Sequence, residues 1–206
     1  MRNYTQLDLN YLGLMIFISL VSIGLQLGGA DVQMALRFSH VALLQGEWWR
    51  FITGHLLHTG WVHLGMNLGA AFLLTLFLDR HRSLHYWILL WLLCMLGTSI
   101  GLYVWSPQVS WYVGLSGALH GVFVAVLAEA WCKGGKMELR LLVLAILAKV
   151  LWEQLQGPMP GSEASIGAPV VVDAHFYGSV TGLVIGIVVL LFNNRQRPGF
   201  GGSKKP

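Results

Sequence analysis

Charged residues are scarce in this sequence. Asp, Glu, Lys and Arg make up 11% of its 206 residues, whereas a soluble domain carries about 25%. So few charges cannot cover the surface of a soluble globule, which excludes an ordinary soluble enzyme. Hydrophobic residues make up 55% of the chain, and their runs approach the roughly 20 residues that cross a bilayer as a helix. We therefore predict a single all-α domain that is integral to a membrane.

Cysteine is equally scarce, with two residues and no Cys-x-x-Cys pair. Both Cys94 and Cys132 lie in apolar segments, so we expect free, buried thiols. Several histidines could contribute to a metal site: His55, His58, His63, His120 and His175. No His-Glu-x-x-His motif is present, and only Asp173 lies close to one of them in the sequence, so we expect neither a catalytic metal nor another cofactor.

The sequence also lacks a basic stripe interleaved with aromatic residues. Its net charge of +4 is therefore not a signal for binding nucleic acid. The nine Trp and six Tyr residues are more typical of the two interfaces of a membrane.

Six apolar segments are the candidate membrane spans: residues 11–27, 63–78, 86–104, 115–132, 139–155 and 174–192. The segment 31–60 is too polar to cross as one helix, and its Trp48, Trp49 and Arg50 suit the membrane interface. Three prolines make 156–173 a loop. We expect residues 1–192 to form a six-helix membrane domain and residues 193–206 to form a polar, basic tail without fixed structure.

The basic residues predict the orientation of this bundle. Ten of the thirteen lie in the N-terminus, in the connections after the second and fourth spans and in the tail: Arg2, Arg80, Arg82, Lys133, Lys136, Arg140, Arg195, Arg197, Lys204 and Lys205. The positive-inside rule then places both termini in the cytoplasm. Ser116 and His175, at the starts of the fourth and sixth spans, would face the opposite side together.

Gly114, Ser116 and Gly117 form a Gly-x-Ser-Gly motif where a polar loop meets an apolar helix. Flanking glycines allow another backbone or a substrate to come close, and the free N–H groups of a first helical turn can stabilise an oxyanion. Small residues in a membrane span also serve close helix packing, and the motif alone does not choose between the two uses.

His175 begins a helix whose Gly178, Gly182 and Gly186 lie on one face, because they are four residues apart. If the helix of Ser116 packs on that face, the imidazole and the hydroxyl can meet as a general base and a nucleophile. The alternative is a histidine that only bonds a backbone carbonyl at a helix interface.

Other polar groups in apolar helices are His63 with Asn67, His120, and Lys149 with Glu153. His63 and Asn67 share one helical face and could donate hydrogen bonds to an oxyanion. His120 lies one turn after Ser116. Lys149 and Glu153 are four residues apart, which favours a mutual ion pair or a contact with a substrate or a gate. Asp173 is expected to be solvated in its loop.

From Glu47 to Gly186 the chain resembles the rhomboid family of intramembrane serine proteases. The motifs that carry the resemblance are Trp49-Arg50, His58, His63 with Asn67, Gly114-Leu-Ser-Gly117 and His175-x-x-Gly178-x-x-x-Gly182. The resemblance implies a Ser116–His175 dyad without a carboxylate and an oxyanion hole of His63, Asn67 and the Ser116 N–H. It also implies structural positions for Arg50 and His58, with Gly114, Gly117 and His120 beside the substrate or the dyad.

His120 stands where many bacterial rhomboids carry a Tyr that stacks on the catalytic histidine. It could stack on His175, tune its basicity or donate to a substrate. The string Gly-Leu-Ser-Gly-Ala-Leu-His-Gly is similar to the rhombosortase branch. That branch implies cleavage of Gly-Gly-type C-terminal sorting tails on exported membrane-anchored proteins, at the periplasmic face of a bacterial inner membrane.

Two other functions remain possible on the sequence. An inactive rhomboid-like protein would bind transmembrane segments without cleaving them, although both Ser116 and His175 are present. A small transporter or channel would need polar groups in the inner halves of its spans, where this chain is apolar.

Overall fold

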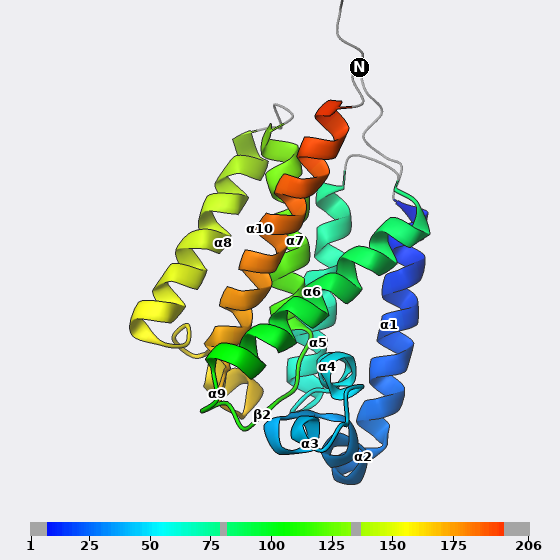
Figure 1. Ribbon diagram of the computed structural model, residues 1–206, viewed down its shortest axis with the longest axis vertical. Coiled ribbons are helices and arrows are strands. Elements are labelled where there is room, and N and C mark those ends of the chain that lie inside the picture. Colours follow the sequence, from blue (N-terminus) through cyan, green and yellow to red (C-terminus); the bar gives the residue numbers. More distant parts are fainter. Residues whose placement is uncertain (1–7, 79–81, 133–136, 196–206) are drawn as a thin grey trace, which may run out of the picture.

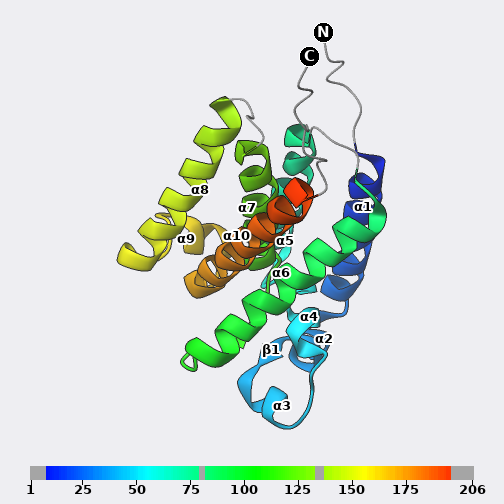
Figure 2. The same cartoon turned by 45° about the horizontal axis from the view of Figure 1, so that its top comes forward.

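The structure is a computed structural model that describes residues 8–78, 82–132 and 137–195. Long helices run side by side as a bundle, and the short elements α2, α3 and α4 gather at one end of it (Figures 1 and 2). The start of α1 and the end of α10 both lie towards the opposite end (Figure 1).

The elements follow the chain in this order: α1 (Leu9–Leu27), α2 (Gly29–Leu36), β1 (Phe38–Ser39), α3 (His40–Leu44), α4 (Arg50–Thr53), the 3-10 turn η1 (Gly54–Leu56), α5 (Trp61–Leu73), the 3-10 turn η2 (Leu74–Phe77), α6 (Leu84–Trp105), β2 (Trp111–Tyr112), α7 (Ser116–Cys132), α8 (Met137–Gln156), α9 (Ser162–Ile166) and α10 (Val172–Arg195).

Each of the six predicted spans falls on a long helix, or on α5 continued by η2. Length and composition allow three of these helices, α1, α6 and α10, to cross a membrane. The apolar stretches of α5 with η2 and of α7 are shorter, and α8 carries four charged residues. The predicted loop 156–173 contains α9. The first three residues of the predicted tail, 193–195, instead continue α10, and the rest of it, from 196 onward, lies outside the described residues.

Asp8 fixes the start of α1 and joins it to α6. Its carboxylate accepts hydrogen bonds from the backbone N–H groups of Asn10 and Tyr11, at 3.0 and 3.1 Å, and so caps the helix. The same carboxylate accepts from the indole N–H of Trp87 at 2.9 Å. Buried Tyr11 and Trp87 then pack edge to face beside this link.

The segment 31–60 folds as short helices around a two-stranded antiparallel sheet, in which Phe38 lies opposite Tyr112. The Arg50 guanidinium donates to the carbonyls of Met34 and Arg37, at 2.9 and 2.8 Å, and pairs with Glu47 at 2.6 Å. Arg50 therefore holds the segment together, as its structural position in the resemblance implied. The sequence did not reveal the sheet, which ties this segment to the loop before Ser116.

Helix α7 occupies the middle of the bundle and packs on α5, α6, α8 and α10. Gly178 and Gly182 of α10 meet the backbone of α7 at Gly117 and Gly121, as the glycine spacing predicts. The thiol of Cys94 is buried, as expected. The same expectation was wrong for Cys132, which is exposed because it lies in the last turn of α7.

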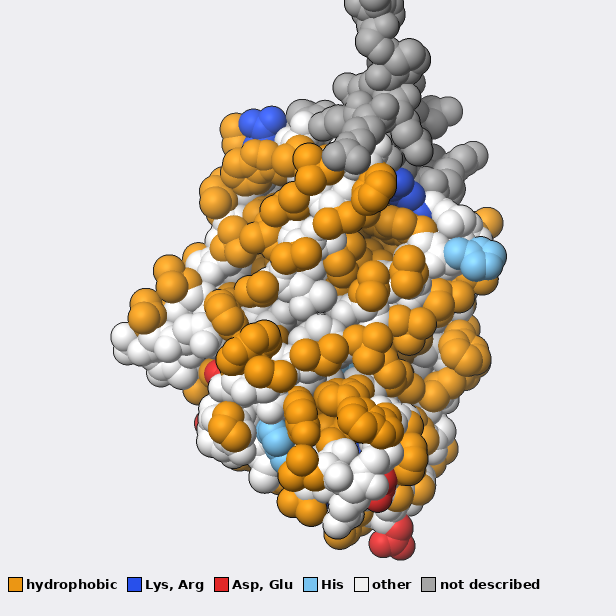
Figure 3. All heavy atoms as spheres, viewed as in Figure 1, with side chains coloured by type: hydrophobic (Ala, Val, Ile, Leu, Met, Phe, Trp, Pro, Cys, Tyr) orange, Lys and Arg blue, Asp and Glu red, His pale blue; other side chains and the backbone are white. Residues whose placement is uncertain are grey.

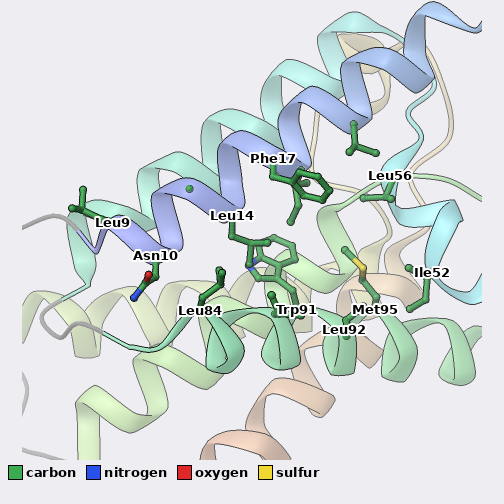
Figure 4. A pocket seen from close by; sticks show the side chains of 14 residues that line it. Leu9, Asn10, Leu14, Phe17, Ile52, Leu56, Leu84, Trp91, Leu92 and Met95 are labelled. Atoms are coloured by element: carbon green, nitrogen blue, oxygen red, sulfur yellow. The ribbon is translucent and has the colours of Figure 1, made fainter.

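Hydrophobic side chains cover most of the visible wall of the bundle (Figure 3). Lys and Arg side chains appear near its upper end and Asp and Glu near its lower end in that view. A groove of about 550 Å³ opens between α1 and α6, and the side chains of Phe17, Leu56, Trp91 and Met95 are among those that line it (Figure 4). None of the predicted site residues lies in this groove.

Candidate active site

The structure brings Ser116 and His175 together. Ser116 is the first residue of α7, and His175 lies in the first turn of α10. The Ser116 Oγ is 2.9 Å from Nε2 of His175, and the imidazole is buried. The close contact between the glycine faces of α7 and α10 explains how two side chains 59 residues apart in the sequence meet.

Gly114 makes the turn into α7. Its φ of +127° is a conformation that side-chain-bearing residues rarely adopt, and its N–H donates to the carbonyl of Gly54 at 3.1 Å. A Cβ at this position would lie 2.9 Å from Cε1 of His63. Both the backbone conformation and the close approach of His63 therefore require glycine here.

Tyr112 holds the backbone around Ser116 in place, a role that the sequence analysis did not predict. Its hydroxyl donates to the Gly114 carbonyl at 2.5 Å and accepts from the Gly117 N–H at 3.3 Å, so it braces both sides of Ser116. Burial raises the pKa of Tyr112 to about 12, which keeps this hydroxyl protonated. The only hint in the sequence was its place in the loop that leads into the serine motif.

His63 and Asn67 both face the turn before Ser116. Thr59 presents its hydroxyl at 3.0 Å and its backbone N–H at 3.5 Å to Nδ1 of His63. Because a backbone N–H can only donate, Nδ1 is the acceptor and Nε2 carries the proton. That nitrogen would lie 3.0 Å from a Cβ at Gly114.

The amide nitrogen of Asn67 is buried and has no hydrogen-bond partner among the described residues. It would lie 3.8 Å from the same Cβ at Gly114. A buried donor without a partner is costly and rare in native proteins. Together with Nε2–H of His63 it offers two donors beside the serine.

Two further buried histidines, His58 and His55, lie close to His63. The ring of His58 meets that of His63 edge to face, with centroids 5.0 Å apart. His55 is hydrogen-bonded through Nε2 to the Met95 carbonyl and the Ser99 hydroxyl, both at 2.9 Å. Burial lowers the pKa of His58 to about 3 and that of His55 to about 4, so both rings are neutral supports.

His120 stacks on His175, with ring centroids 4.3 Å apart and planes inclined by 20°. Its Nε2 lies 3.1 Å from the ammonium of Lys149, which can only donate, so Nε2 is the acceptor. Nδ1 then donates to the Ser116 carbonyl at 2.7 Å. Of the three roles open for His120 on the sequence, the structure displays stacking.

Lys149 and Glu153 form the expected ion pair, with Nζ 2.7 Å from Oε1. Unexpectedly, the second carboxylate oxygen of Glu153 lies 2.8 Å from Nδ1 of His175. Asp173 is not simply solvated, because it accepts from the Ser106 hydroxyl at 2.5 Å and from the Gln108 amide at 3.1 Å. The carboxylate at the imidazole is therefore Glu153, which the sequence marked only as a charge within an apolar helix.

His120, Glu153 and His175 have ligand atoms within 4.8 Å of one another, close enough to suggest a metal site. The Lys149 ammonium, however, already lies within hydrogen-bonding distance of His120 and Glu153. A metal ion would have to displace this cation or be repelled by it. The cluster therefore suits a network of hydrogen bonds better than a metal centre.

A hydroxyl in contact with an imidazole, with free donors beside it, is an arrangement suited to acyl transfer. A family model described as "Rhomboid domain" matches residues 45–192.

Three curated relatives carry related names. "Putative rhomboid protease YdcA" of Bacillus subtilis is 37% identical over 84 residues, which are 41% of this chain and 42% of that protein. "Rhomboid protease GluP" of the same organism is 33% identical over 109 residues, 53% of this chain and 21% of that protein. "Rhomboid-type serine protease 2" of Emericella nidulans is 29% identical over 169 residues, 78% of this chain and 30% of that protein. The chain thus spans less than half the length of each relative.

Proposed function

The chain belongs to the rhomboid family, and from that membership we propose that it is an intramembrane serine protease with Ser116 as nucleophile and His175 as general base. The observation that carries the proposal is the 2.9 Å contact between Ser116 Oγ and His175 Nε2. Removal of a hydroxyl proton by a base in such contact makes serine a nucleophile.

In the first half of the reaction, the Ser116 oxygen attacks the carbonyl carbon of the scissile peptide bond while its proton moves to Nε2 of His175. The carbonyl oxygen becomes an oxyanion. His63 Nε2–H, the Asn67 amide and the Ser116 backbone N–H stabilise it, and such donors are each worth about 10²–10³-fold in rate. Nε2 then gives its proton to the leaving amine, and the C–N bond breaks.

In the second half, water attacks the Ser116 ester, and His175 accepts the water proton. The ester bond breaks, the proton returns to Ser116, and the new C-terminal carboxylic acid leaves. No cofactor takes part in either half. Water must reach the serine, so the site needs a polar opening from one side of the membrane.

In this proposal residues 1–192 form one six-helix membrane domain in a bacterial inner membrane, and residues 193–206 are a basic cytoplasmic tail. Both termini face the cytoplasm, and the site opens to the periplasm. The start of α1 and the end of α10 lie at one end of the bundle, while Ser116 begins α7 near β2, towards the other end (Figure 1). This separation supports the orientation, as does the distribution of basic residues.

The proposed substrates are membrane-anchored exported proteins with a C-terminal sorting tail, made of a glycine-rich motif, a hydrophobic span and basic residues. The support for this substrate class is the string around Ser116, Gly-Leu-Ser-Gly-Ala-Leu-His-Gly, which resembles the rhombosortase branch. Nucleic acid is not a partner, and the lipid bilayer is the surrounding medium.

The test is a cleavage assay in liposomes. A model protein that ends in a Gly-Gly motif, an apolar span and basic residues is incubated with wild type, Ser116→Ala or His175→Ala, and the cut is located by mass spectrometry. Cleavage next to the glycines that both substitutions abolish supports the protease and its substrate class. A Ser116-dependent cut in other single-span proteins alone rejects the sorting tail but retains the protease.

Absence of any Ser116-dependent cut contradicts the proposal and favours a protein that binds transmembrane segments without cleaving them. Binding of the same substrate by wild type and Ser116→Ala, measured by co-purification, then distinguishes that function from an inert preparation.

A further inference from the structure

Glu153 presents both of its carboxylate oxygens to charged or ionisable partners. Oε1 accepts from the Lys149 ammonium at 2.7 Å, and Oε2 lies 2.8 Å from Nδ1 of His175. The Glu153 side chain is 2% exposed. Helix α8, which carries it, lies against α7 and α10, the helices of the serine and the histidine (Figures 1 and 2).

A buried carboxylate is costly unless it is paired and hydrogen-bonded. Lys149 supplies the paired charge, and because an ammonium is only a donor, it favours the ionised form of Glu153. An ionised carboxylate is only an acceptor. The nitrogen that contacts it, Nδ1 of His175, must therefore carry the proton.

Once Nδ1 carries the proton, Nε2 of neutral His175 has a free lone pair. That lone pair points to the Ser116 hydroxyl, 2.9 Å away. The opposite tautomer would present an N–H to the serine and could not accept its proton. Lys149 lies 3.4 Å from Nδ1, farther than the carboxylate, so it does not compete as the donor to that nitrogen.

We propose that Glu153, held by Lys149, is a positioning residue that fixes the tautomer and orientation of His175 and stabilises its imidazolium during acyl transfer. This inference rests on the proposed function, and it adds a third and a fourth residue to a site for which the family resemblance implies a dyad alone. When the Ser116 proton arrives at Nε2, the positive charge forms beside Glu153. Lys149 limits this stabilisation, so the imidazolium can still release its proton to the leaving amine.

The decisive variant is Glu153→Gln. Lys149 will donate to the amide oxygen of the new side chain, which turns the amide N–H₂ group towards Nδ1 of His175. The imidazole is then driven into the unproductive tautomer. We expect kcat to fall by up to about 10⁴-fold, the loss that follows when the carboxylate of a Ser-His-Asp triad becomes an amide, with KM changed less than about threefold, because no contact with the substrate is removed.

Two further variants separate positioning from a general structural effect. Glu153→Asp keeps the charge and should retain more activity than Glu153→Gln. Glu138→Gln makes the same chemical change on an exposed residue of the same helix, so its kcat and KM should match wild type.

The pH dependence of kcat/KM distinguishes positioning of His175 from a purely structural role of Glu153, because a structural role would leave that dependence unchanged. The groups that face His175 are His63 on α5, His120 on α7, and Lys149 and Glu153 on α8. Among them Glu153 is the one carboxylate in hydrogen-bond contact with the ring. The acidic limb of the kcat/KM profile should therefore move to lower pH in Glu153→Gln, because the imidazolium loses its anionic partner.

A second measurement does not depend on protease activity. Nitrogen NMR of ¹⁵N-histidine-labelled protein in liposomes reports the tautomer of each neutral ring, with His175 assigned by its loss in His175→Ala. Wild type should show the Nδ1–H form of His175, and Glu153→Gln should show the Nε2–H form. The Nε2–H form in wild type overturns the inference even if the variant does not fold.

The outcomes separate the two proposals. Ser116-dependent cleavage with unchanged kcat and pH profile in Glu153→Gln overturns the inference and leaves the protease. A tautomer that depends on Glu153 in a protein without Ser116-dependent cleavage overturns the protease and its general base, while the positioning of His175 by Glu153 stands.

Discussion

Gly178 of α10 faces the backbone of Gly117 of α7 so closely that a Cβ on Gly178 would overlap the Gly117 carbonyl oxygen. No side chain can move aside here, because the obstacle is the backbone of the helix that begins with Ser116. This contact sets the distance between the two helices and, with it, the distance between Ser116 and His175.

Gly178→Ala should therefore force α7 and α10 apart. We expect a loss of about 1–3 kcal/mol in the free energy of unfolding, as for other overpacked cores, together with loss of the Ser116–His175 contact. Thermal unfolding in detergent measures the first effect and substrate cleavage the second.

The matched control is Gly13→Ala on α1, where a Cβ meets nothing within 4 Å. This variant should be as stable as wild type or slightly more stable, because Ala favours a helix by about 1 kcal/mol over Gly. Equal stability of Gly178→Ala and Gly13→Ala contradicts the packing account.

The stacked ring of His120 gives a second prediction. His120→Ala removes the ring that lies 4.3 Å from the His175 ring centroid. A stacked pair is worth about 0.5–1.5 kcal/mol, so kcat/KM should fall about two- to tenfold. His120→Tyr keeps an aromatic ring and should lose less activity than His120→Ala, while the reverse order would show that the imidazole nitrogens matter more than the stacking.

A third prediction concerns the Asn67 amide. Asn67→Ala should lower kcat by about 10²–10³-fold if the amide donates to the oxyanion. The free energy of unfolding of Asn67→Ala should not show the decrease that follows loss of a hydrogen bond, because Nδ2 of Asn67 has no partner among the described residues. A lower melting temperature with unchanged kcat contradicts the assigned role.

Acid should weaken the fold through His58 and His55. Burial lowers their pKa values to about 3 and about 4, from an ordinary value of 6.5. Below pH 6.5 the unfolded chain therefore binds more protons than the folded protein. The free energy of unfolding should fall as the pH drops from 6.5 towards 4, by up to about 1.4 kcal/mol per pH unit for each histidine.

Melting temperatures in detergent between pH 7.5 and 4.5 check this prediction. His58→Leu removes one of the two titrating rings without breaking a hydrogen bond among the described residues. It should make the pH dependence shallower. The same slope in wild type and His58→Leu excludes His58 as a source of the acid effect.

The long helices were predictable because their apolar runs and glycine spacing are local properties of the sequence. The predicted span 86–104, for example, lies wholly within α6, Leu84–Trp105. The pairing of Phe38 with Tyr112 was not predictable, since a two-residue strand carries no periodic pattern and its partner lies more than 70 residues away.

The residues of the candidate site also fall into those that the sequence predicted and those that it did not. The motifs of Ser116, His63, Asn67 and His175 are visible in the sequence because they are short and lie at helix ends or on one helical face. The contact of Glu153 with His175 depends on the rotation of α8 against α10, which the sequence of α8 does not specify. Its only trace in the sequence was an ionisable pair in an apolar helix, which is costly without a partner.

Covalent labelling of Ser116 tests the central claim most directly. The protein in liposomes is treated with a fluorophosphonate, which forms a stable bond with an activated serine, and the modified residue is located by peptide mass spectrometry. We predict one adduct per chain, on Ser116, abolished in Ser116→Ala and strongly slowed in His175→Ala. No adduct on Ser116, or equal labelling rates in wild type and His175→Ala, would contradict a nucleophile activated by this histidine.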